Sequence, residues 1–516
     1  MCALVLFGKH QGKARRLWRL PSSLHSVNQP FVRFENSYSQ TFPELNEMWQ
    51  AAPASAPKPL IINQQLAHDL GVDLAALETP SGTDFLVGNL VLEGSTPVAM
   101  AYAGHQFGGY SPRLGDGRAL LLGEVINIGG ERRDIHLKGS GRTPFSRGGD
   151  GKAVVGPMLR EYVISEAMHA LGIPTTRSLA VIATGDQVAR ETWLPGAVLC
   201  RVAASHLRVG TFQFAAQHED ETLLLRLADY AIDRHYPHAR QSDNRHLAFF
   251  QAVVTQQASL LAQWMLIGFI HGVMNTDNMT ISGETIDYGP CAFMDAFDPT
   301  TVFSSIDHQG RYAYANQPHI AQWNLARLAE TLLPLFADTQ EKSVEVATAV
   351  LLDFTVQYQS FWLTGMRKKL GILNQQNGDE ELITELFDIM QAQKVDFTSL
   401  FRSLSSSVRG DSSSARALFT EPTAFDRWES SWHERLSLET TEGMAVADVM
   451  DLVNPIYIPR NHTVEGALTA ATEGDLTPLH QLLDVLAQPF KQRSGYESFA
   501  TPAPPEFTHY QTFCGT

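Results

Sequence analysis

Short hydrophobic runs separated by glycine-rich turns dominate the chain between Val98 and Cys200. Such runs, bounded by glycine and polar turn residues, are typical of β-strands. The segments 119–128 and 134–137 predict two strands, and the Gly129-Gly130 pair between them predicts a hairpin turn. This part of the chain is therefore expected to be rich in β-structure.

From Leu223 onwards the hydrophobic positions recur with the period of an α-helix. The segment 247–272 predicts one long helix that ends at Gly272, because glycine readily adopts the left-handed conformation found after helix C-termini. A proline start and a glycine stop predict a further helix from Pro157 to Gly172. Helices are also predicted at 322–336 and 343–370, and a serine-rich polar loop at 403–414. The pattern indicates an α+β fold in which a β-rich part precedes a helical part.

The order of these patterns divides the chain into four parts. Residues 31–200 are expected to form a β-rich lobe, 201–345 a helical lobe, and 346–516 a helical C-terminal extension. Residues 1–30 form a separate N-terminal extension, which is basic and contains no Asp or Glu. This composition fits a mitochondrial targeting segment or an artefact of the assigned start site, and both interpretations stay open. The first would place the protein in mitochondria and the second in the cytoplasm.

Composition excludes several classes of protein. The 516 residues include 39 Lys and Arg against 55 Asp and Glu, which gives a formal net charge of −16. Phosphate backbones are bound by basic surfaces, so a general nucleic-acid binder is not expected. No apolar stretch is long enough to predict a membrane-spanning helix. The four cysteines show no Cys-x-x-Cys pair or regular spacing, so we expect neither a disulfide framework nor a thiolate zinc site. The expected location is therefore a reducing compartment, the cytoplasm.

Glycine and charged residues cluster in the β-rich part. Gly115-Asp-Gly-Arg118 leads directly into a predicted strand, and two glycines at this spacing let the backbone approach a phosphate closely. Lys138 ends the next strand, where the lysine of a kinase reaches the phosphates of ATP. Glu161 lies in the second turn of the following helix, from which a kinase glutamate pairs with that lysine. The structural alternatives are a plain turn, a lysine that faces water and an exposed helical glutamate.

The most specific motif is the segment His271-Gly-Val-Met-Asn-Thr-Asp-Asn278, followed by Asp287-Tyr-Gly289. A kinase catalytic loop has a histidine and an asparagine at the same separation, and a later Asp-Phe-Gly supplies a second metal ligand. Asn278 and Asp287 therefore predict a Mg²⁺ or Mn²⁺ site. Val273 stands where a kinase carries its proton-accepting aspartate, and valine cannot accept a proton. The protein is then either a non-catalytic scaffold or an enzyme with a different reaction, for which Asp277 is the candidate base.

These stretches together resemble the selenoprotein O family of kinase-like protein adenylyltransferases. The resemblance rests on the residues at 115–118, 137–147, 149–151 and 271–278, and it extends to Asp287-Tyr-Gly-Pro290 and Pro459-Arg-Asn-His462. It implies a protein-kinase-like bilobal fold with a β-rich N-lobe, an α-helical C-lobe and a helical C-terminal extension. It also implies that ATP lies inverted relative to kinases. AMP, or UMP from UTP, would then be transferred to Ser, Thr or Tyr hydroxyls of target proteins, with release of pyrophosphate and with Mg²⁺ or Mn²⁺ as cofactor.

The same resemblance implies roles for individual residues. Asp277 would act as the general base, Asn278 and Asp287 would hold the metal, and Glu161 would orient the lysine. The nucleotide-binding residues that it implies are Gly115, Gly117, Arg118, Lys138, Asp150, Gly151, Arg201, Arg208 and Asp287. Some family members carry a cysteine or selenocysteine near the C-terminus, a position that Cys514 matches, and Cys291 is the candidate for its redox partner. The alternative is that Cys514 is a surface thiol without a role.

Two alternative functions stay open at this point. A small-molecule or protein phosphotransferase of the kinase type would use the same nucleotide site, although Val273 argues against it. A non-catalytic pseudokinase would bind the nucleotide without transferring any part of it. In each case we expect a monomer whose partners are a nucleoside triphosphate and proteins, not nucleic acids or membranes.

Overall fold

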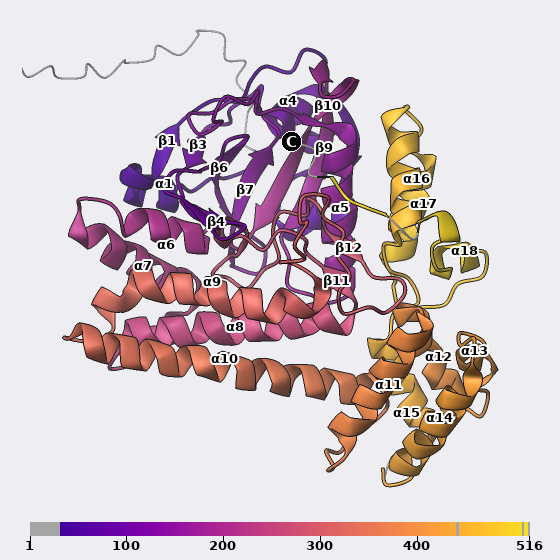
Figure 1. Ribbon diagram of the computed structural model, residues 1–516. Coiled ribbons are helices and arrows are strands. Elements are labelled where there is room, and N and C mark those ends of the chain that lie inside the picture. Colours follow the sequence, from indigo (N-terminus) through magenta and orange to yellow (C-terminus); the bar gives the residue numbers. More distant parts are fainter. Residues whose placement is uncertain (1–30, 440–442, 508–509, 514–516) are drawn as a thin grey trace, which may run out of the picture.

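The computed structural model describes residues 31–439, 443–507 and 510–513. A β-sheet occupies the upper part of the molecule in Figure 1, and long helices lie beneath it. The chain is thus a mixed α/β protein with an antiparallel sheet and a helical C-terminal region, as the hydrophobic pattern predicted. The N-terminal extension predicted at 1–30 lies outside the described residues, and both interpretations of it stay open.

The sheet has eight strands, and each recorded pairing between neighbours is antiparallel. Its order is β1-β3-β6-β7-β10-β9-β2, with β8 paired to β10 off that path. The strands are Asn46–Met48 (β1), Lys58–Ile62 (β2), Val98–Met100 (β3), Ala119–Ile126 (β6), Arg132–Lys138 (β7), Ala153–Val154 (β8), Arg177–Ala189 (β9) and Trp193–Ala203 (β10). Ala119 pairs with Lys138 and Ile126 with Arg132, which confirms the predicted hairpin of β6 and β7.

Two small ladders lie outside this sheet. In one, β4 (Gly104–Gln106) pairs with β5 (Gly109–Ser111). In the other, β11 (Phe269–Ile270) pairs with β12 (Ala292–Phe293). The second ladder joins the two ends of the segment that holds the candidate catalytic loop, so it fixes where that loop begins and ends.

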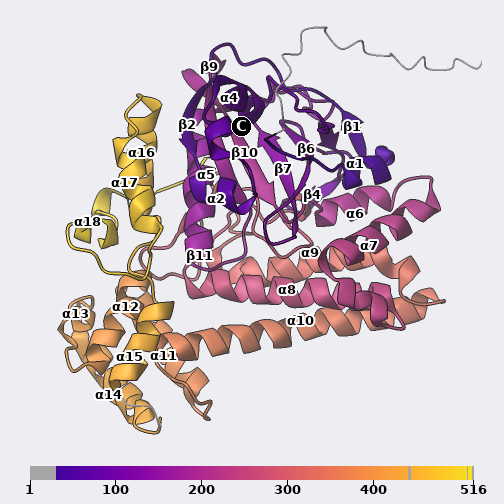
Figure 2. The same cartoon turned by 180° about the vertical axis from the view of Figure 1, so that it is seen from behind.

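Three long helices, α8 (Arg245–Leu266), α9 (Gln317–Leu332) and α10 (Gln340–Lys369), pack together beneath the sheet (Figures 1 and 2). The helix α5 (Val155–Ala170) packs against β9 and β10 instead. The domain boundaries expected after residues 200 and 345 fall inside β10 and α10, so both elements run from one part into the next. The other helices are Ser37–Thr41 (α1), Gln64–Asp69 (α2), Leu74–Leu77 (α3), Pro80–Val87 (α4), Val209–Ala215 (α6), Glu221–His235 (α7), Asp379–Gln393 (α11), Phe397–Val408 (α12), Ser413–Arg416 (α13), Pro422–Leu436 (α14), Gly443–Val453 (α15), Asn461–Thr472 (α16), Thr477–Leu486 (α17) and Glu497–Ala500 (α18).

The helix predicted over 247–272 ends earlier than expected. α8 stops at Leu266, and Gly268, with φ +70°, takes the left-handed position that follows its C-terminus. The chain then forms β11, so Gly272 belongs to the loop after that strand. Gly272 also has a positive φ, of +81°. Both glycines therefore meet the conformational requirement of a helix stop, and the sequence alone could not choose between them.

The helix predicted from Pro157 to Gly172 is confirmed with a shifted start. α5 begins at Val155, so Pro157 lies within its first turn, where a missing N–H removes no helical hydrogen bond. Gly172 follows the helix end with φ +79°. The helices predicted from 322 and 343 likewise begin a few residues earlier, at Gln317 and Gln340.

The serine-rich segment predicted as a polar loop over 403–414 is helical in its first half. α12 continues to Val408, and the hydroxyls of Ser403 and Ser405 donate to carbonyl oxygens three residues before them. Ser405 and Ser407 are buried. Serine hydroxyls can be satisfied by the backbone of their own helix, so this polar composition did not exclude a buried helix.

The helices of the C-terminal part form two groups (Figure 1). The helices α11, α12, α14 and α15 contribute to one hydrophobic core, whereas α16 and α17 return to the sheet and pack on α5. Arg460, fully buried, lies where the groups meet and donates to Asp396 at 2.7 and 2.9 Å and to Asp295 at 2.5 Å. The extension therefore supports α5, the helix that carries Glu161.

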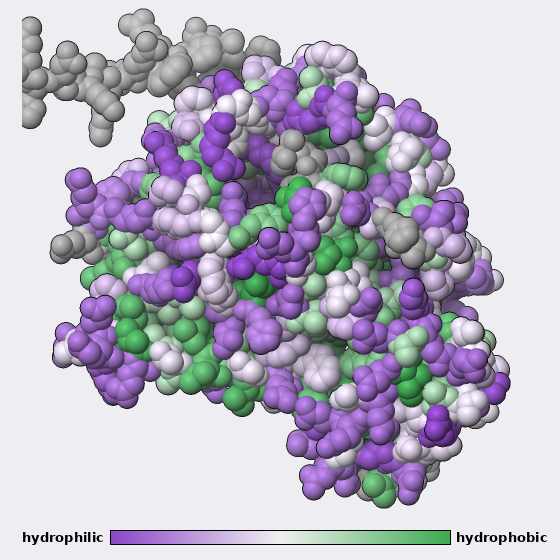
Figure 3. Space-filling view, viewed as in Figure 1, coloured by the Kyte–Doolittle hydropathy of each residue, from purple (hydrophilic) through white to green (hydrophobic). Residues whose placement is uncertain are grey.

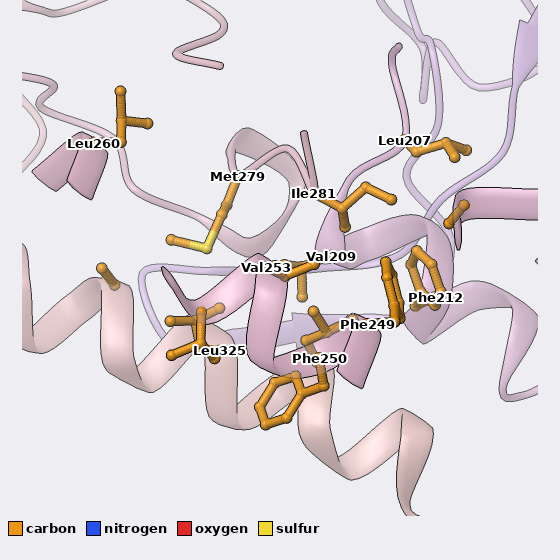
Figure 4. Close-up of a cluster of buried hydrophobic side chains, with 14 of the residues drawn as sticks. Leu207, Val209, Phe212, Phe249, Phe250, Val253, Leu260, Met279, Ile281 and Leu325 are labelled. Atoms are coloured by element: carbon orange, nitrogen blue, oxygen red, sulfur yellow. The ribbon is translucent and has the colours of Figure 1, made fainter. Parts of the chain in front are cut away.

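A hydrophobic cluster beneath the sheet fixes the segments that lead to the candidate site (Figure 4). Leu207 and Val209 flank Arg208, and Met279 and Ile281 follow the candidate catalytic loop. These side chains pack in one core with residues of α8, among them Val253. Because apolar burial on both sides holds the two segments in place, the polar residues beside them are positioned without contributing to the core themselves.

The outer surface is predominantly polar on the face seen in Figure 3, with apolar side chains interspersed. Among the described residues, every helix falls short of the length or the apolar character needed to span a lipid bilayer.

One buried lysine in the helical part lacks a counter-charge. Lys369, at the end of α10, is 3 % exposed, and its Nζ lies 4.4 Å from the ring centre of Phe401 and 5.6 Å from that of Phe397. No carboxylate among the described residues forms an ion pair with it. Burial lowers the pKa of Lys369 to about 7.

This lysine makes stability depend on pH. Between about pH 7 and the ordinary lysine pKa of about 10.4, the unfolded chain binds a proton at this position that the folded chain has released, so stability rises with pH there. At pH 6.5 the full penalty of burying the ammonium group applies. We expect Lys369→Met to raise the free energy of unfolding by roughly 1–3 kcal/mol at pH 6.5 and by much less at pH 10.

Thermal unfolding of the wild type and the variant at both pH values tests this expectation. The exposed neighbour Lys368 provides the control, because Lys368→Met removes the same charge without relieving burial. Equal shifts in melting temperature at the two pH values for Lys369→Met would contradict the interpretation.

Candidate active site

A cavity of about 310 Å³ opens between the sheet and the loops above the long helices. Its walls come from the turn before β6, the loop at 145–152, the ends of β7 and β10, and the segment 273–290. The lining includes the predicted residues Gly115, Gly117, Arg118, Lys138, Asp150, Gly151, Arg201, Arg208, Asp277, Asn278 and Asp287. Residues that lie far apart in the sequence thus line one cavity.

Asp287 lies at the centre of a cluster of cations. Its Oδ1 accepts hydrogen bonds from Lys138 Nζ at 2.8 Å and from Arg201 Nη1 at 2.7 Å, and its Oδ2 accepts one from Arg208 Nη1 at 2.7 Å. Glu161 supports the cluster from α5, because its Oε2 accepts from Lys138 at 2.5 Å and its Oε1 from Arg201 at 3.1 Å. The Lys138–Glu161 ion pair predicted from the sequence is therefore confirmed.

The charges of this cluster determine the ionisation of Asp287. Burial alone would raise its pKa, but the cations of Lys138, Arg201 and Arg208 outweigh that effect and hold the pKa of Asp287 well below its ordinary value. The backbone of Asp287 adopts φ +62°, an uncommon conformation for a residue other than glycine. The carboxylate is thus kept charged and is aimed into the cavity by a local conformation that the loop has to stabilise.

Sequence reasoning missed a polar layer behind these residues. His136 Nε2 lies 3.0 Å from Asp116 Oδ2, and its Nδ1 lies 3.3 Å from Arg201 Nη2. Burial lowers the pKa of His136, so a neutral ring that donates to Asp116 and accepts from Arg201 fits this geometry. The sequence did contain a signal for both residues. Asp116 lies inside the Gly-Asp-Gly-Arg motif, and His136 precedes Lys138 by two positions, which places both side chains on the same face of the strand.

Asp277 presents a different carboxylate environment from Asp287. Its Oδ1 is buried without a hydrogen-bond partner among the described residues, and its Oδ2 accepts from Gln106 Nε2 at 3.3 Å. Burial raises the pKa of Asp277 to about 6, although Arg208 acts in the opposite direction. A carboxylate that is desolvated and only partly satisfied can accept a proton from a group in the cavity.

A metal site at Asn278 and Asp287 would have few ligands from the protein. The described residues contain no group of three or more His, Cys, Asp or Glu side chains placed to hold a metal ion. The Nδ2 of Asn278 donates to the Val273 carbonyl at 3.0 Å, which leaves its amide oxygen for a cation. This oxygen and a carboxylate oxygen of Asp287 are of the kind that Mg²⁺ or Mn²⁺ binds, and the remaining ligands would be phosphate oxygens and water.

The glycines of the cavity wall occupy positions that a side chain could not. A Cβ on Gly115, which has φ +90°, would lie 2.5 Å from a ring carbon of Phe145. A Cβ on Gly151, with φ +68°, would lie 2.2 Å from the carbonyl oxygen of Gly141. Asp150 beside it is held by Arg190, whose Nη1 donates to Oδ2 at 2.8 Å. Close backbone packing therefore shapes this end of the cavity.

The predicted cysteine pair is described only in part. Cys291 is fully buried, and burial raises the pKa of its thiol to about 12. Cys514 lies outside the described residues, so its pairing with Cys291 stays a prediction. The segment before it does approach the site: Thr512 Oγ1 donates to the carbonyl of Pro290, the neighbour of Cys291, at 2.7 Å.

Comparison with known proteins adds to this geometry. A family model described as "Protein adenylyltransferase SelO" matches residues 31–487. A protein nucleotidyltransferase YdiU from Mycolicibacterium smegmatis is 59 % identical over 491 residues, which cover 94 % of this chain and 98 % of that protein. Proteins of the same name from Mycolicibacterium paratuberculosis and Pseudarthrobacter chlorophenolicus are each 58 % identical, over 94 % and 92 % of this chain and 98 % and 96 % of their own lengths.

Proposed function

Since the chain belongs to the family of the protein adenylyltransferase SelO, a nucleotidyltransferase family that transfers AMP to proteins, we propose a specific reaction for its cavity. ATP, or UTP with UMP as the transferred group, binds in the cavity. The nucleoside monophosphate passes to a Ser, Thr or Tyr hydroxyl of a target protein, and pyrophosphate leaves.

The link that Arg208 makes between Asp287 and the loop of Asp277 carries this proposal. Arg208 Nη1 donates both to the backbone carbonyl oxygen of Asp277 at 2.8 Å and to Asp287 Oδ2 at 2.7 Å. Asp287 lies among the cations of Lys138, Arg201 and Arg208, which suit a polyphosphate. The carboxylate of Asp277 makes no hydrogen bond to those cations in the described part of the chain, and its desolvated oxygen suits proton abstraction from an acceptor hydroxyl. The site thus offers a base and a pyrophosphate-binding region within one cavity.

The arrangement supports a protein-kinase-like fold with an altered reaction. An antiparallel sheet carries the lysine and a glycine-rich turn, a helix carries the paired glutamate, and the helical part carries the asparagine and aspartate loop. Val273 lines the cavity where a kinase needs its aspartate. A base placed for the γ-phosphate has no role when the α-phosphate faces the acceptor, so valine is compatible with transfer of AMP.

The proposed reaction uses this chain's residues in four roles. Asp277 takes the proton of the acceptor hydroxyl, whose oxygen attacks the α-phosphorus while the bond to the bridging oxygen of pyrophosphate breaks. Lys138, Arg201 and Arg208 neutralise the charge that develops on the leaving pyrophosphate. Glu161 orients Lys138. Asn278 and Asp287 would hold Mg²⁺ or Mn²⁺, which supplies further charge neutralisation at the phosphates.

Two forms of radioactive ATP test the proposal. Incubation of the enzyme and a protein extract with Mn²⁺ and α-labelled ATP is expected to label protein, and γ-labelled ATP is expected to leave it unlabelled. Label retained from the γ position alone would show a phosphotransferase, and no label from either position would show a nucleotide-binding protein without transfer. A variant with Lys138→Ala serves as the control for label that binds without catalysis.

A further inference from the structure

The hairpin of β4 and β5 links the candidate base to a surface outside the nucleotide cavity. Gln106 Nε2 donates to Asp277 Oδ2 at 3.3 Å. The backbone N–H groups of the neighbouring residues are also fixed to the catalytic loop: His105 donates to Thr276 Oγ1 at 2.7 Å and Phe107 to Asn275 Oδ1 at 3.1 Å. The hairpin is therefore held against the loop at three successive residues, and its tip has a defined position relative to Asp277.

Aromatic side chains and Arg311 surround the tip of this hairpin. Phe107, with φ +51°, is 38 % exposed and packs 5.1 Å from the ring of Tyr312. The Arg311 guanidinium lies 4.9 Å from the ring centre of Trp323 and 5.7 Å from that of Tyr312. A Cβ on Gly108 would lie 3.7 Å from the same guanidinium. We call these residues, together with His105 and Tyr110, the hairpin surface.

Arg311 is a cation without a counter-charge in the described part of the chain. Its Nε is buried and has no hydrogen-bond partner there. The nearest aspartate in sequence, Asp307, accepts instead from the backbone N–H groups of Arg311 at 2.9 Å and Tyr312 at 2.7 Å. Arg327, which also lies over Trp323, is paired with Glu330 at 2.6 Å. The guanidinium of Arg311 is thus a cation that no carboxylate of the described residues neutralises through an ion pair, although the whole chain carries −16.

We propose that the hairpin surface binds the acceptor segment of the target protein, and that Arg311 recognises an acidic side chain two or three residues from the modified hydroxyl. The proximity follows from the hairpin itself. Gln106, which donates to Asp277, and Gly108, which lies beside Arg311, are two positions apart at the tip of the hairpin, so a short peptide that lies along the tip can reach both places. This inference rests on the proposed transfer to protein hydroxyls and adds a substrate preference to it.

The exposed rings give an extended peptide a surface on which to lie. Tyr110 is 44 % exposed, and its ring packs 4.7 Å from that of His105, which in turn contacts Trp323 at 5.1 Å. Burial and the charges of Arg327 and Arg311 lower the pKa of His105, which keeps this ring neutral beside the two arginines. Arg311 is stacked on the rings of Trp323 and Tyr312, so its guanidinium is already held in place when a carboxylate binds to it.

Peptide binding tests the inference independently of catalysis. The probes are two fluorescein-labelled peptides with a central tyrosine. One carries aspartate and the other lysine at the second and third positions before and after that tyrosine. Fluorescence anisotropy in the presence of Mn²⁺ and a non-hydrolysable ATP analogue is expected to show at least about tenfold tighter binding of the acidic peptide to the wild type. Arg311→Glu is expected to remove or reverse that preference, and Arg311→Lys to retain part of it.

Arg416→Glu is the matched control, because Arg416 is an exposed, ion-paired arginine of α13. It should leave the preference unchanged. Equal binding of both peptides by the wild type, or an unchanged preference in Arg311→Glu, would overturn the inference. Should Arg311→Glu lower the melting temperature strongly, Arg311→Gln removes the charge with less disturbance.

Transfer from α-labelled ATP to the same peptides separates this inference from the proposed function. If the acidic peptide binds more tightly but no peptide or protein is labelled, recognition by Arg311 is supported and AMP transfer is refuted. If both peptides bind equally and are labelled equally, recognition by Arg311 is refuted and AMP transfer is supported.

Discussion

Asp287→Asn is expected to lower the rate of AMP transfer at least about 10³-fold, which corresponds to about 4 kcal/mol of lost transition-state stabilisation. Asparagine keeps the size of the side chain but removes the charge that holds Lys138, Arg201 and Arg208 in their positions. It also removes the proposed anionic metal ligand. Single-turnover transfer of α-label measures the effect, and thermal unfolding shows how far the fold is retained.

A second buried aspartate provides a matched control for this variant. Asp379 binds Arg435 and Arg367 at 2.7 Å each in the C-terminal helices, far in sequence from the cavity. Asp379→Asn breaks the ion pairs with Arg367 and Arg435. It should lower the melting temperature and leave the rate of transfer close to that of the wild type. If Asp287→Asn also kept transfer within about threefold of the wild type, the central role of Asp287 in binding phosphate and metal would be wrong.

Asp277→Asn is expected to reduce the rate constant for transfer by about 10²–10⁴-fold while nucleotide binding is retained, because a general base contributes an amount of this order. The amide has the shape of the carboxylate but cannot take up the acceptor proton. Gln106 is the side chain that donates to the Asp277 carboxylate in the described part of the chain, and Oδ1 has no partner there, so the substitution should disturb the fold little. Quenched time courses of transfer measure the rate constant, and equilibrium binding of a fluorescent ATP analogue measures the nucleotide affinity.

The control here is a second carboxylate with a raised pKa, the half-buried Glu284. Burial raises the pKa of Glu284 to about 7, but this residue does not line the nucleotide cavity. Glu284→Gln should transfer AMP at the wild-type rate. A weaker affinity for ATP with an unchanged rate constant in Asp277→Asn would assign this aspartate to nucleotide binding and refute its role as the base.

Much of the site followed from local sequence because its parts are local motifs. The Gly115–Arg118 turn, the strand that ends at Lys138 and the segment 271–278 each place their polar residues by short-range geometry, and the structure brings all three to one cavity. Glu161 was predictable because the helix that carries it has clear start and stop residues. The roles of these residues in the reaction stay predictions until the variants are measured.

Other parts depend on contacts between distant segments and gave no local signal. Gln106 reaches Asp277 across 171 residues of sequence, and a glutamine in a short glycine-rich hairpin has many ordinary explanations. The end of α8 was misplaced because Gly268 and Gly272 both adopt positive φ. The packing of α16 and α17 on α5 was equally invisible, since an amphipathic helix does not specify its partner.

By itself the sequence determined most of the elements, the order of the β-rich and helical parts, the family and the polar residues of the local motifs that line the cavity. Periodicity, turn residues and motif spacing act over a few residues, so they can be found without knowing the fold. Only the tertiary structure decided that Asp287 is surrounded by three cations, that Asp277 is desolvated, and that Arg311, at the tip of a hairpin fixed to the catalytic loop, has no ion pair with any described residue. Charge pairing and burial depend on which segments meet in space. The packing between residues that are distant in the sequence determines which segments meet.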